Sequence, residues 1–245
     1  MRRGASILPS LFTTGNLFLG YWAIIKALNG QLEAAAPLIG WAILLDALDG
    51  RIARLTGTTS EFGGELDSLA DVISFGVAPA LLAFMWGLGD VARVGWLASF
   101  LFLMCGTLRL ARFNVQRHAV DGRYFVGLPI PAAAAQVASV VYFLPGGGGD
   151  RLGVVFATVG VVVLAFLMVS TFRYHSFKGV DLRQRRSYIT VLGIAILFLL
   201  VALDPQAVLL GITVLYTLSG PIGYLYGLVR RRREPLPAET SQESQ

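Results

Sequence analysis

The sequence predicts an all-α protein whose helices cross a membrane about eight times. Hydrophobic residues make up 55% of the 245 positions and charged residues only 14%, and the mean hydropathy is +0.67. Soluble domains carry roughly 25% charged residues. Apolar runs also recur that are long enough to cross a hydrocarbon core of about 30 Å, which takes about 20 residues. These observations exclude an ordinary soluble fold.

The spans are delimited by the polar and charged residues between them. The first is too long, and too polar at Thr13, Thr14 and Asn16, for a cleaved signal, so we interpret it as a span. A polar connection, residues 56–64, separates the second from the third, and the glycines of 146–149 predict an outer loop between the fifth and the sixth. The predicted ranges are 11–29, 32–54, 66–87, 94–112, 127–145, 152–172, 188–203 and 206–229.

The chain is predicted to form a single transmembrane domain, residues 1–233, followed by a disordered tail, residues 234–245. The tail has almost no apolar side chains to bury. The net charge is +5, and four arginines, residues 230–233, directly follow the last span. A basic run in that place is typical of a contact with lipid headgroups, so we do not expect a nucleic-acid partner.

The basic residues also predict the orientation. With the N-terminus on the cytoplasmic side, every Lys and Arg except Lys26, Arg93 and Arg151 falls in an inner segment. Positive residues near span ends are retained on that side. We therefore expect a multi-pass protein of the cell (inner) membrane, with both termini and the polar end of the third span facing the cytoplasm.

Four aspartates lie within 26 residues at the ends of the second and third spans: Asp46, Asp49, Asp67 and Asp71. An aspartate at mid-membrane costs about 2.5 to 3.5 kcal/mol on insertion scales, so four need cationic partners. Asp46 and Asp49 are three residues apart and Asp67 and Asp71 four, so each pair shares one helix face. If the two helix ends approach each other as an antiparallel pair, the four carboxylates surround one volume.

Carboxylate oxygens select hard divalent cations, Mg²⁺, Mn²⁺ or Ca²⁺. Four carboxylates suffice for two ions that share ligands, the arrangement that clamps a transferring phosphoryl group. Gly50 and Gly63 allow a ligand to come close to the backbone, and Arg54 can donate two hydrogen bonds to phosphate oxygens. These residues predict a diphosphate site. Cys105 is the single cysteine, which argues against a cysteine-based metal site.

The spacing D-x2-D-G-x2-A-R-x8-G-x3-D-x3-D, from Asp46 to Asp71, is complete. It resembles the motif of the CDP-alcohol phosphotransferases at every fixed position. Further segments resemble the phosphatidylserine synthase branch of that family, so that the resemblance covers about the first 180 residues and the last two spans add only hydrophobicity. These segments are 8–16 (LPSLFTTGN), 74–79 (SFGVAP), 109–114 (RLARFN), 124–131 (YFVGLPIP) and 176–178 (SFK).

The resemblance implies transfer of the phosphatidyl group from CDP-diacylglycerol to the hydroxyl of L-serine by direct attack, with release of CMP. It also implies a homodimer in the lipid bilayer. Asp46, Asp49 and Asp67 would bind one metal ion and Asp46, Asp67 and Asp71 the second, with Asp71 also the general base. The implied contacts to CDP-diacylglycerol are Thr13, Thr14, Asn16, Gly50, Arg54, Ser60 and Gly63.

The pocket for the serine carboxylate is less sharply marked. Arg109 and Arg112 lie three residues apart at the cytoplasmic end of the fourth span, beside Asn114, and an arginine fork suits a carboxylate. Both arginines are equally compatible with a simpler role as membrane anchors or as ligands of lipid phosphate.

Two alternative functions are also compatible with the sequence. Another member of the same family would use glycerol phosphate, inositol phosphate or a different alcohol as acceptor, or an archaeal lipid as donor. A cation-coupled transporter would also place aspartates inside the membrane. Against the transporter, the sequence has no repeated halves, and all four aspartates lie on one adjacent pair of spans.

Overall fold

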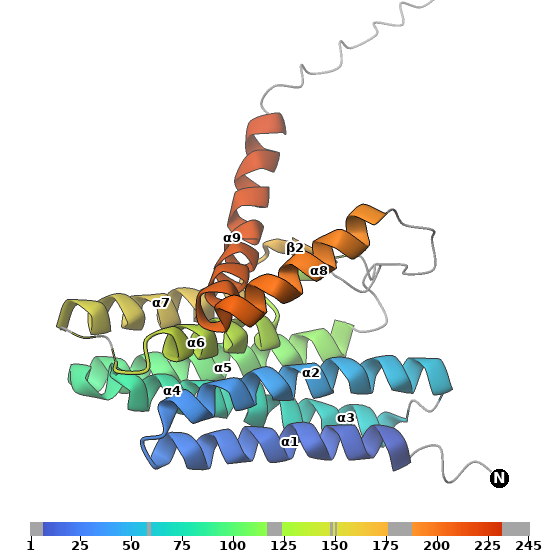
Figure 1. Cartoon of the computed structure of the whole chain (residues 1–245), viewed down its shortest axis with the longest axis horizontal. Coiled ribbons are helices and arrows are strands. Elements are labelled where there is room, and N and C mark those ends of the chain that lie inside the picture. Colours follow the sequence, from blue (N-terminus) through green and yellow to red (C-terminus); the bar gives the residue numbers. More distant parts are fainter. Residues whose placement is uncertain are drawn as a thin grey trace, which may run out of the picture.

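The computed structural model describes residues 7–57, 60–116, 124–147, 149, 151–175 and 188–231. The predicted tail, residues 234–245, lies outside them. The described chain is almost entirely helical (Figure 1), which confirms the all-α class. Its longer helices are α1 (Ile7–Leu28), α2 (Leu32–Thr56), α5 (Ala92–Gln116), α7 (Arg151–Val169) and α9 (Pro205–Arg231), and its shorter ones are α6 (Ile130–Phe143) and α8 (Tyr188–Leu203).

The predicted third span is built from three consecutive helical segments. They are α3 (Glu61–Asp71), a π-helical turn η1 (Val72–Val77) and α4 (Ala78–Trp86). A short 3₁₀ turn, η2 (Leu88–Val91), then leads into α5. The π-helical turn therefore interrupts this span directly after Asp71, the last aspartate of the motif.

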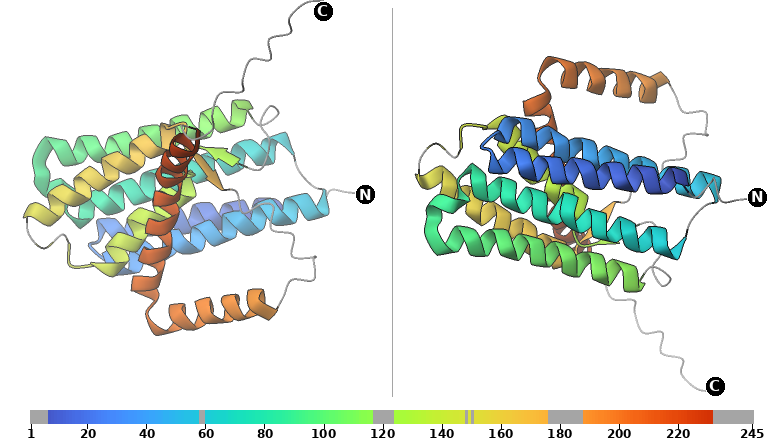
Figure 2. Two further views of the ribbon diagram at one scale, coloured as in Figure 1. Left: turned by 90° about the horizontal axis from the view of Figure 1, so that it is seen from above. Right: turned by 90° about the horizontal axis from the view of Figure 1, so that it is seen from below.

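The helices α1, α2, α3 to α4, α5 and α7 run side by side along one direction, while α9 runs across them (Figures 1 and 2). Among the described residues, five stretches are long and apolar enough to cross a membrane: Leu11–Leu28, Glu61–Trp86, Arg93–Val115, Arg151–Val169 and Pro205–Tyr226. Apolar α6 is shorter. The chain is thus a helical membrane protein, and the count of eight spans stays a prediction.

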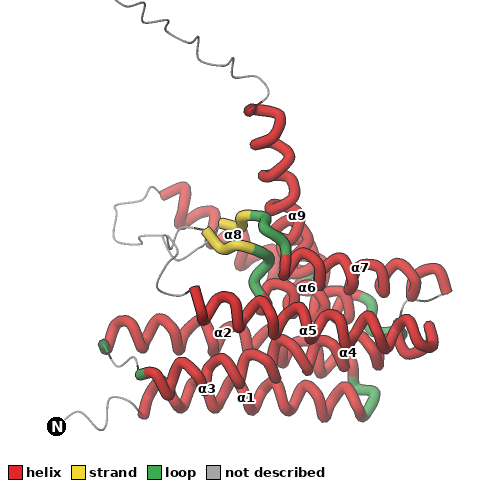
Figure 3. Tube along the Cα trace, turned by 180° about the vertical axis from the view of Figure 1, so that it is seen from behind, coloured by secondary structure: helices red, strands yellow, loops and turns green. Residues whose placement is uncertain are grey.

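Two short strands were missed by the sequence interpretation. β1 (Tyr124–Val126) pairs antiparallel with β2 (Arg173–His175), opposing Phe125 to Tyr174, and the pair lies beside α9 (Figure 3). Residue 127, predicted to open the fifth span, instead lies between β1 and α6. There Gly127 adopts a φ of 81°, and a Cβ would lie 2.3 Å from the carbonyl oxygen of Met168, so only glycine fits.

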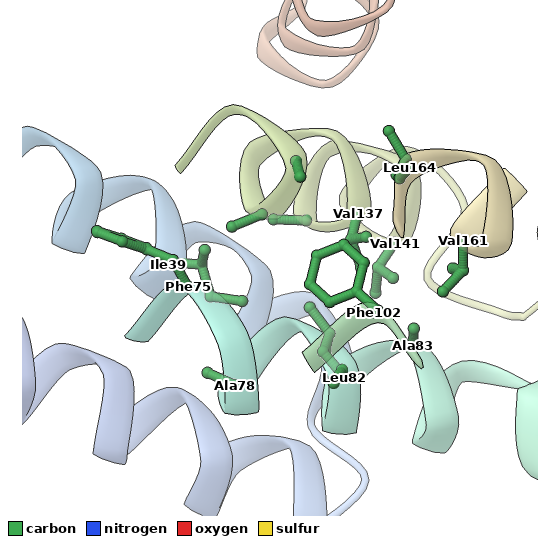
Figure 4. Packing of buried hydrophobic residues seen from close by; sticks show 14 of the residues in the cluster. Ile39, Phe75, Ala78, Leu82, Ala83, Phe102, Val137, Val141, Val161 and Leu164 are labelled. Atoms are coloured by element: carbon green, nitrogen blue, oxygen red, sulfur yellow. The ribbon is translucent and has the colours of Figure 1, made fainter. Parts of the chain in front are cut away.

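The hydrophobic core lies between the parallel helices. Figure 4 shows side chains from several of them meeting there, including Phe75, Leu82, Phe102, Val137 and Leu164. Phe75 and Phe102 are fully buried. This packing fixes η1 and α4 against α5 and α6, and so holds the segment that begins at Asp71.

A glycine contact at the start of α5 gives a test of the packing. A Cβ on Gly95 would lie 1.7 Å from the carbonyl oxygen of Leu88, whereas a Cβ on Gly160 of α7 would meet nothing within 4 Å. We expect Gly95→Ala to lower the melting temperature by several degrees, because overpacking costs about 1 to 3 kcal/mol and 1 kcal/mol shifts Tm by about 2 to 4 °C at this size.

The control Gly160→Ala should leave the melting temperature unchanged or raise it, since alanine favours the helix over glycine. The measurement is thermal unfolding of the two variants in the same detergent. Equal melting temperatures would contradict the packing of η2 on α5.

Candidate active site

Two caps fix the ends of the helices that carry the aspartates. α2 ends at Gly57, whose φ of 64° is left-handed and whose N–H bonds the carbonyl of Ala53. Ser60 then caps α3, because its Oγ accepts a hydrogen bond of 3.0 Å from the N–H of Gly63. α1 packs against both α2 and α3 and is thus their common partner.

Three of the four aspartates meet in one cluster. Carboxylate oxygens of Asp46, from α2, and of Asp67 and Asp71, from α3, all lie within 4.8 Å of one another. Asp71 is buried, whereas Asp46 and Asp67 are partly exposed. This is the set that the resemblance assigns to the second ion. Their proximity fits a divalent cation, because like charges so close together inside a membrane protein need a counter-charge.

Asp49 lies apart from this cluster and makes a contact to α1. Its side chain is buried, and Oδ2 accepts a hydrogen bond from the hydroxyl of Thr13. Its second oxygen, Oδ1, is buried and has no hydrogen-bond partner among the described residues. A buried acceptor without a donor is costly, so this oxygen also fits a cation ligand. Its membership of the first metal site stays a prediction.

The first helix contacts the cluster a second time through Asn16, which is fully buried. Its Nδ2 donates to Asp71 Oδ1 over 3.3 Å, and its backbone carbonyl accepts from the hydroxyl of Ser74 over 3.0 Å. Ser74 lies in η1, one turn beyond Asp71. π-Helical turns are frequent at functional sites, and this one is tied directly to α1.

The three residues of α5 that were predicted to bind the serine carboxylate, Arg109, Arg112 and Asn114, have different surroundings. Arg109 is buried and lies within electrostatic range of Asp71 and of Tyr216, with its guanidinium 5.8 Å from the ring centroid of Phe113. Arg112 is exposed. Asn114 donates to Ser68 Oγ over 2.8 Å. The structure therefore brings Arg109 and Asn114 to the α3 side of the site and leaves Arg112 on the surface.

The residues predicted to contact the nucleotide come from α1, from the end of α2 and from the start of α3. Gly50 and Gly63 are partly exposed, and Ser60 and Thr14 are exposed. The side chain of Arg54 lies outside the described part of the chain. Gly50 directly follows Asp49 in the chain, and Thr13 and Asn16 are buried against carboxylates.

Several residues near the site were not anticipated. Ser68 accepts from Asn114 and itself donates to the carbonyl of Gly64 over 2.9 Å. Tyr216 of α9 lies near Arg109, although α9 was expected to add only hydrophobicity. No local pattern marks such residues, because their partners are distant in sequence.

Tyr216 also links the site to the small sheet. Tyr174 of β2 is fully buried, and its ring centroid lies 5.7 Å from that of Tyr216. Its hydroxyl donates to the backbone carbonyl of Thr217 over 3.2 Å. Burial, with a smaller contribution from Tyr216, raises the pKa of Tyr174 to about 12.

An aspartate cluster that fits divalent cations, beside the buried Arg109 of a helical membrane protein, defines a candidate site for phosphoryl-transfer chemistry. The chain belongs to the CDP-alcohol phosphatidyltransferase family, whose family model matches residues 6–172. That range contains the complete motif and ends just after α7.

More specifically, the chain is similar to proteins with related names. It is 39% identical over 229 residues to a CDP-diacylglycerol–serine O-phosphatidyltransferase of Helicobacter pylori, covering 91% of this chain and 93% of the relative. It is 41% identical over 174 residues to an archaetidylserine synthase of Methanothermobacter thermautotrophicus, covering 70% and 71%. It is 32% identical over 171 residues to a CDP-diacylglycerol–serine O-phosphatidyltransferase of Bacillus subtilis, covering 70% and 91%.

The aspartate cluster can be tested without an enzymatic assay. If the cluster binds a divalent cation, Mn²⁺ should raise the melting temperature of the purified protein, since a ligand that binds only the folded state stabilises it. We expect Asp67→Asn to abolish this rise. Glu65→Gln, an exposed residue on the same helix, is the matched control and should retain it. A full Mn²⁺ response in Asp67→Asn would show that the cluster is not the ion site.

Proposed function

We propose that this protein transfers the phosphatidyl group of CDP-diacylglycerol to the hydroxyl of L-serine, giving phosphatidylserine and CMP. The observation that carries the proposal is the convergence of Asp46, Asp67 and Asp71 within a motif complete at every fixed position. The names of the relatives support serine as the acceptor, because both the bacterial and the archaeal name contain serine.

The aspartates would hold two divalent ions, Mg²⁺ or Mn²⁺ and less favourably Ca²⁺, with Asp46, Asp49 and Asp67 around one and Asp46, Asp67 and Asp71 around the other. When bound, such ions neutralise charge on the diphosphate and stabilise the leaving CMP. Gly50, Gly63, Ser60 and Arg54 would bind the cytidine diphosphate part, with Arg54 donating to phosphate oxygens.

The reaction proceeds by direct attack. Asp71 accepts the proton of the serine hydroxyl while the serine oxygen forms a bond to the phosphatidyl phosphorus and the bond from that phosphorus to the CMP oxygen breaks. Arg109 would bind the serine carboxylate through its guanidinium fork, and its position near Asp71 supports this role. Asn114 is bonded to Ser68, next to Asp67, so it orients α3 against α5.

The cellular location, the orientation and the oligomeric state are also part of the proposal. We place the protein in the cell membrane with both termini and the site on the cytoplasmic side, on the basis of the distribution of basic residues. We further propose a homodimer, which rests on the family resemblance alone.

The donor lipid has a second candidate. One relative is named an archaetidylserine synthase, so the same site could use an ether-linked archaeal lipid with serine as acceptor. Assays with CDP-diacylglycerol and with its ether-linked counterpart, at equal serine, discriminate the two donors.

The reaction itself is tested by CMP release from CDP-diacylglycerol in detergent with Mn²⁺ or Mg²⁺. We expect release that depends on L-serine and that falls by about 10² to 10⁴ in Asp71→Asn, because this change removes the general base. Release with another alcohol, but not with serine, would show that the protein uses a different acceptor within the same family. The absence of release with every acceptor and metal would overturn the enzyme assignment.

The role of Arg109 is tested by the serine dependence of the rate. Arg109→Lys should raise the KM for serine about tenfold, because hydrogen bonds to charged groups contribute about 1.5 to 3 kcal/mol and lysine lacks the fork. Arg112→Lys, at an exposed position, should change it less. The KM for CDP-diacylglycerol serves as the internal reference. An unchanged KM for serine in Arg109→Lys would place the carboxylate elsewhere.

A further inference from the structure

One face of α1 is directed at the motif aspartates. Thr13, Asn16 and Gly20 follow one another at spacings of three and four residues, so they form a single stripe along the helix. All three are buried. Their contacts reach two different elements, because Thr13 meets α2 while Asn16 and Gly20 meet the segment of α3 and η1.

The two polar residues of the stripe each donate to one carboxylate. Thr13 donates its hydroxyl proton to Asp49 Oδ2, and a threonine hydroxyl has only this one proton. Asn16 donates through Nδ2 to Asp71 Oδ1. Each contact therefore takes one lone pair of a carboxylate oxygen and restrains the orientation of that carboxylate. The two aspartates belong to helices separated in sequence by a loop, so α1 sets their relative position.

The helix is held against the motif by more than these two bonds. The carbonyl of Asn16 accepts from Ser74 over 3.0 Å, and a Cβ on Gly20 would lie 2.7 Å from the Cα of Ser74 and 2.3 Å from its Oγ. Such a close approach is possible only for glycine. The carbonyl of Asn16 and the close approach of Gly20 therefore both hold α1 against Ser74 of η1.

We propose that Thr13 and Asn16 are positioning residues that act through Asp49 and Asp71. Thr13 is 4% exposed and Asn16 is 0% exposed, and the hydrogen bonds that they donate go to the two carboxylates. This inference rests on the proposed function and revises the role that family resemblance suggests for these residues.

The size of the effect follows from comparable metal sites. Groups that hydrogen-bond to metal ligands orient them, and their loss typically costs about 10- to 100-fold in metal affinity or activity. Loss of the donor should therefore weaken cation binding more than nucleotide binding. A residue that contacts the nucleotide has the opposite signature.

The experiment compares Thr13→Val, Thr13→Ser and Asn16→Ala with the wild type in detergent. Thr13→Val keeps the shape of the side chain and removes the hydroxyl, and Thr13→Ser restores it. Thr158→Val is the matched control, because Thr158 is equally buried and its hydroxyl, within the part of the chain that the structure describes, donates to the Val154 carbonyl of its own helix. The melting temperature of each variant without metal verifies folding.

Two affinities are measured by calorimetry: that of Mn²⁺ alone, and that of CDP at saturating Mn²⁺. We expect Thr13→Val and Asn16→Ala to raise the Kd for Mn²⁺ about tenfold and the Kd for CDP less than about twofold. Thr13→Ser and Thr158→Val should match the wild type. A tenfold rise in the Kd for CDP with unchanged Mn²⁺ affinity, or no change in either affinity, would overturn the positioning role.

The outcome is independent of the acceptor. If the wild type binds Mn²⁺ and the variants bind it more weakly, but serine does not elicit CMP release, then the positioning role holds and the proposed function fails. If serine elicits CMP release and the variants retain their Mn²⁺ affinity, then the proposed function holds and the positioning role fails.

Discussion

The main physical constraint on this structure is that carboxylates are costly inside a membrane-embedded helical bundle. Each aspartate there costs a few kcal/mol unless its charge is balanced and its oxygens are hydrogen-bonded. Different elements of the chain supply the hydrogen bonds and the positive charge. α1 supplies neutral donors to Asp49 and Asp71, and α5 supplies the buried cation Arg109. Divalent ions at Asp46, Asp67 and Asp71 would supply the remaining positive charge.

The framework around the site is rigid where the carboxylates need a fixed geometry. The π-helical turn that follows Asp71 is held by Ser74 against α1, and its Phe75 is buried in the core shown in Figure 4. Asn114 ties α5 to α3 through Ser68. Tyr216 of α9 lies near Arg109 and packs against Tyr174 of β2, which links the site to the small sheet.

The fold class and the core of the site were predictable because they depend on local patterns. Apolar runs of membrane length identify helices directly, and the aspartate spacing places pairs of carboxylates on one helix face. The contact of Thr13 with Asp49 was not predictable, because the two residues lie 36 positions apart and only tertiary packing joins them. The same holds for Asn16 and Asp71, for the strand pair, and for α9, whose course across the bundle no hydropathy pattern encodes.

The central claim is that the motif aspartates form a site for two divalent ions. Titration of the purified protein with Mn²⁺, followed by electron paramagnetic resonance, tests it most directly. Ions that share carboxylate ligands lie close enough for their spins to couple, so the account predicts about two bound Mn²⁺ per chain with a spin-coupled spectrum. A single isolated Mn²⁺ signal, or no bound Mn²⁺, would contradict it.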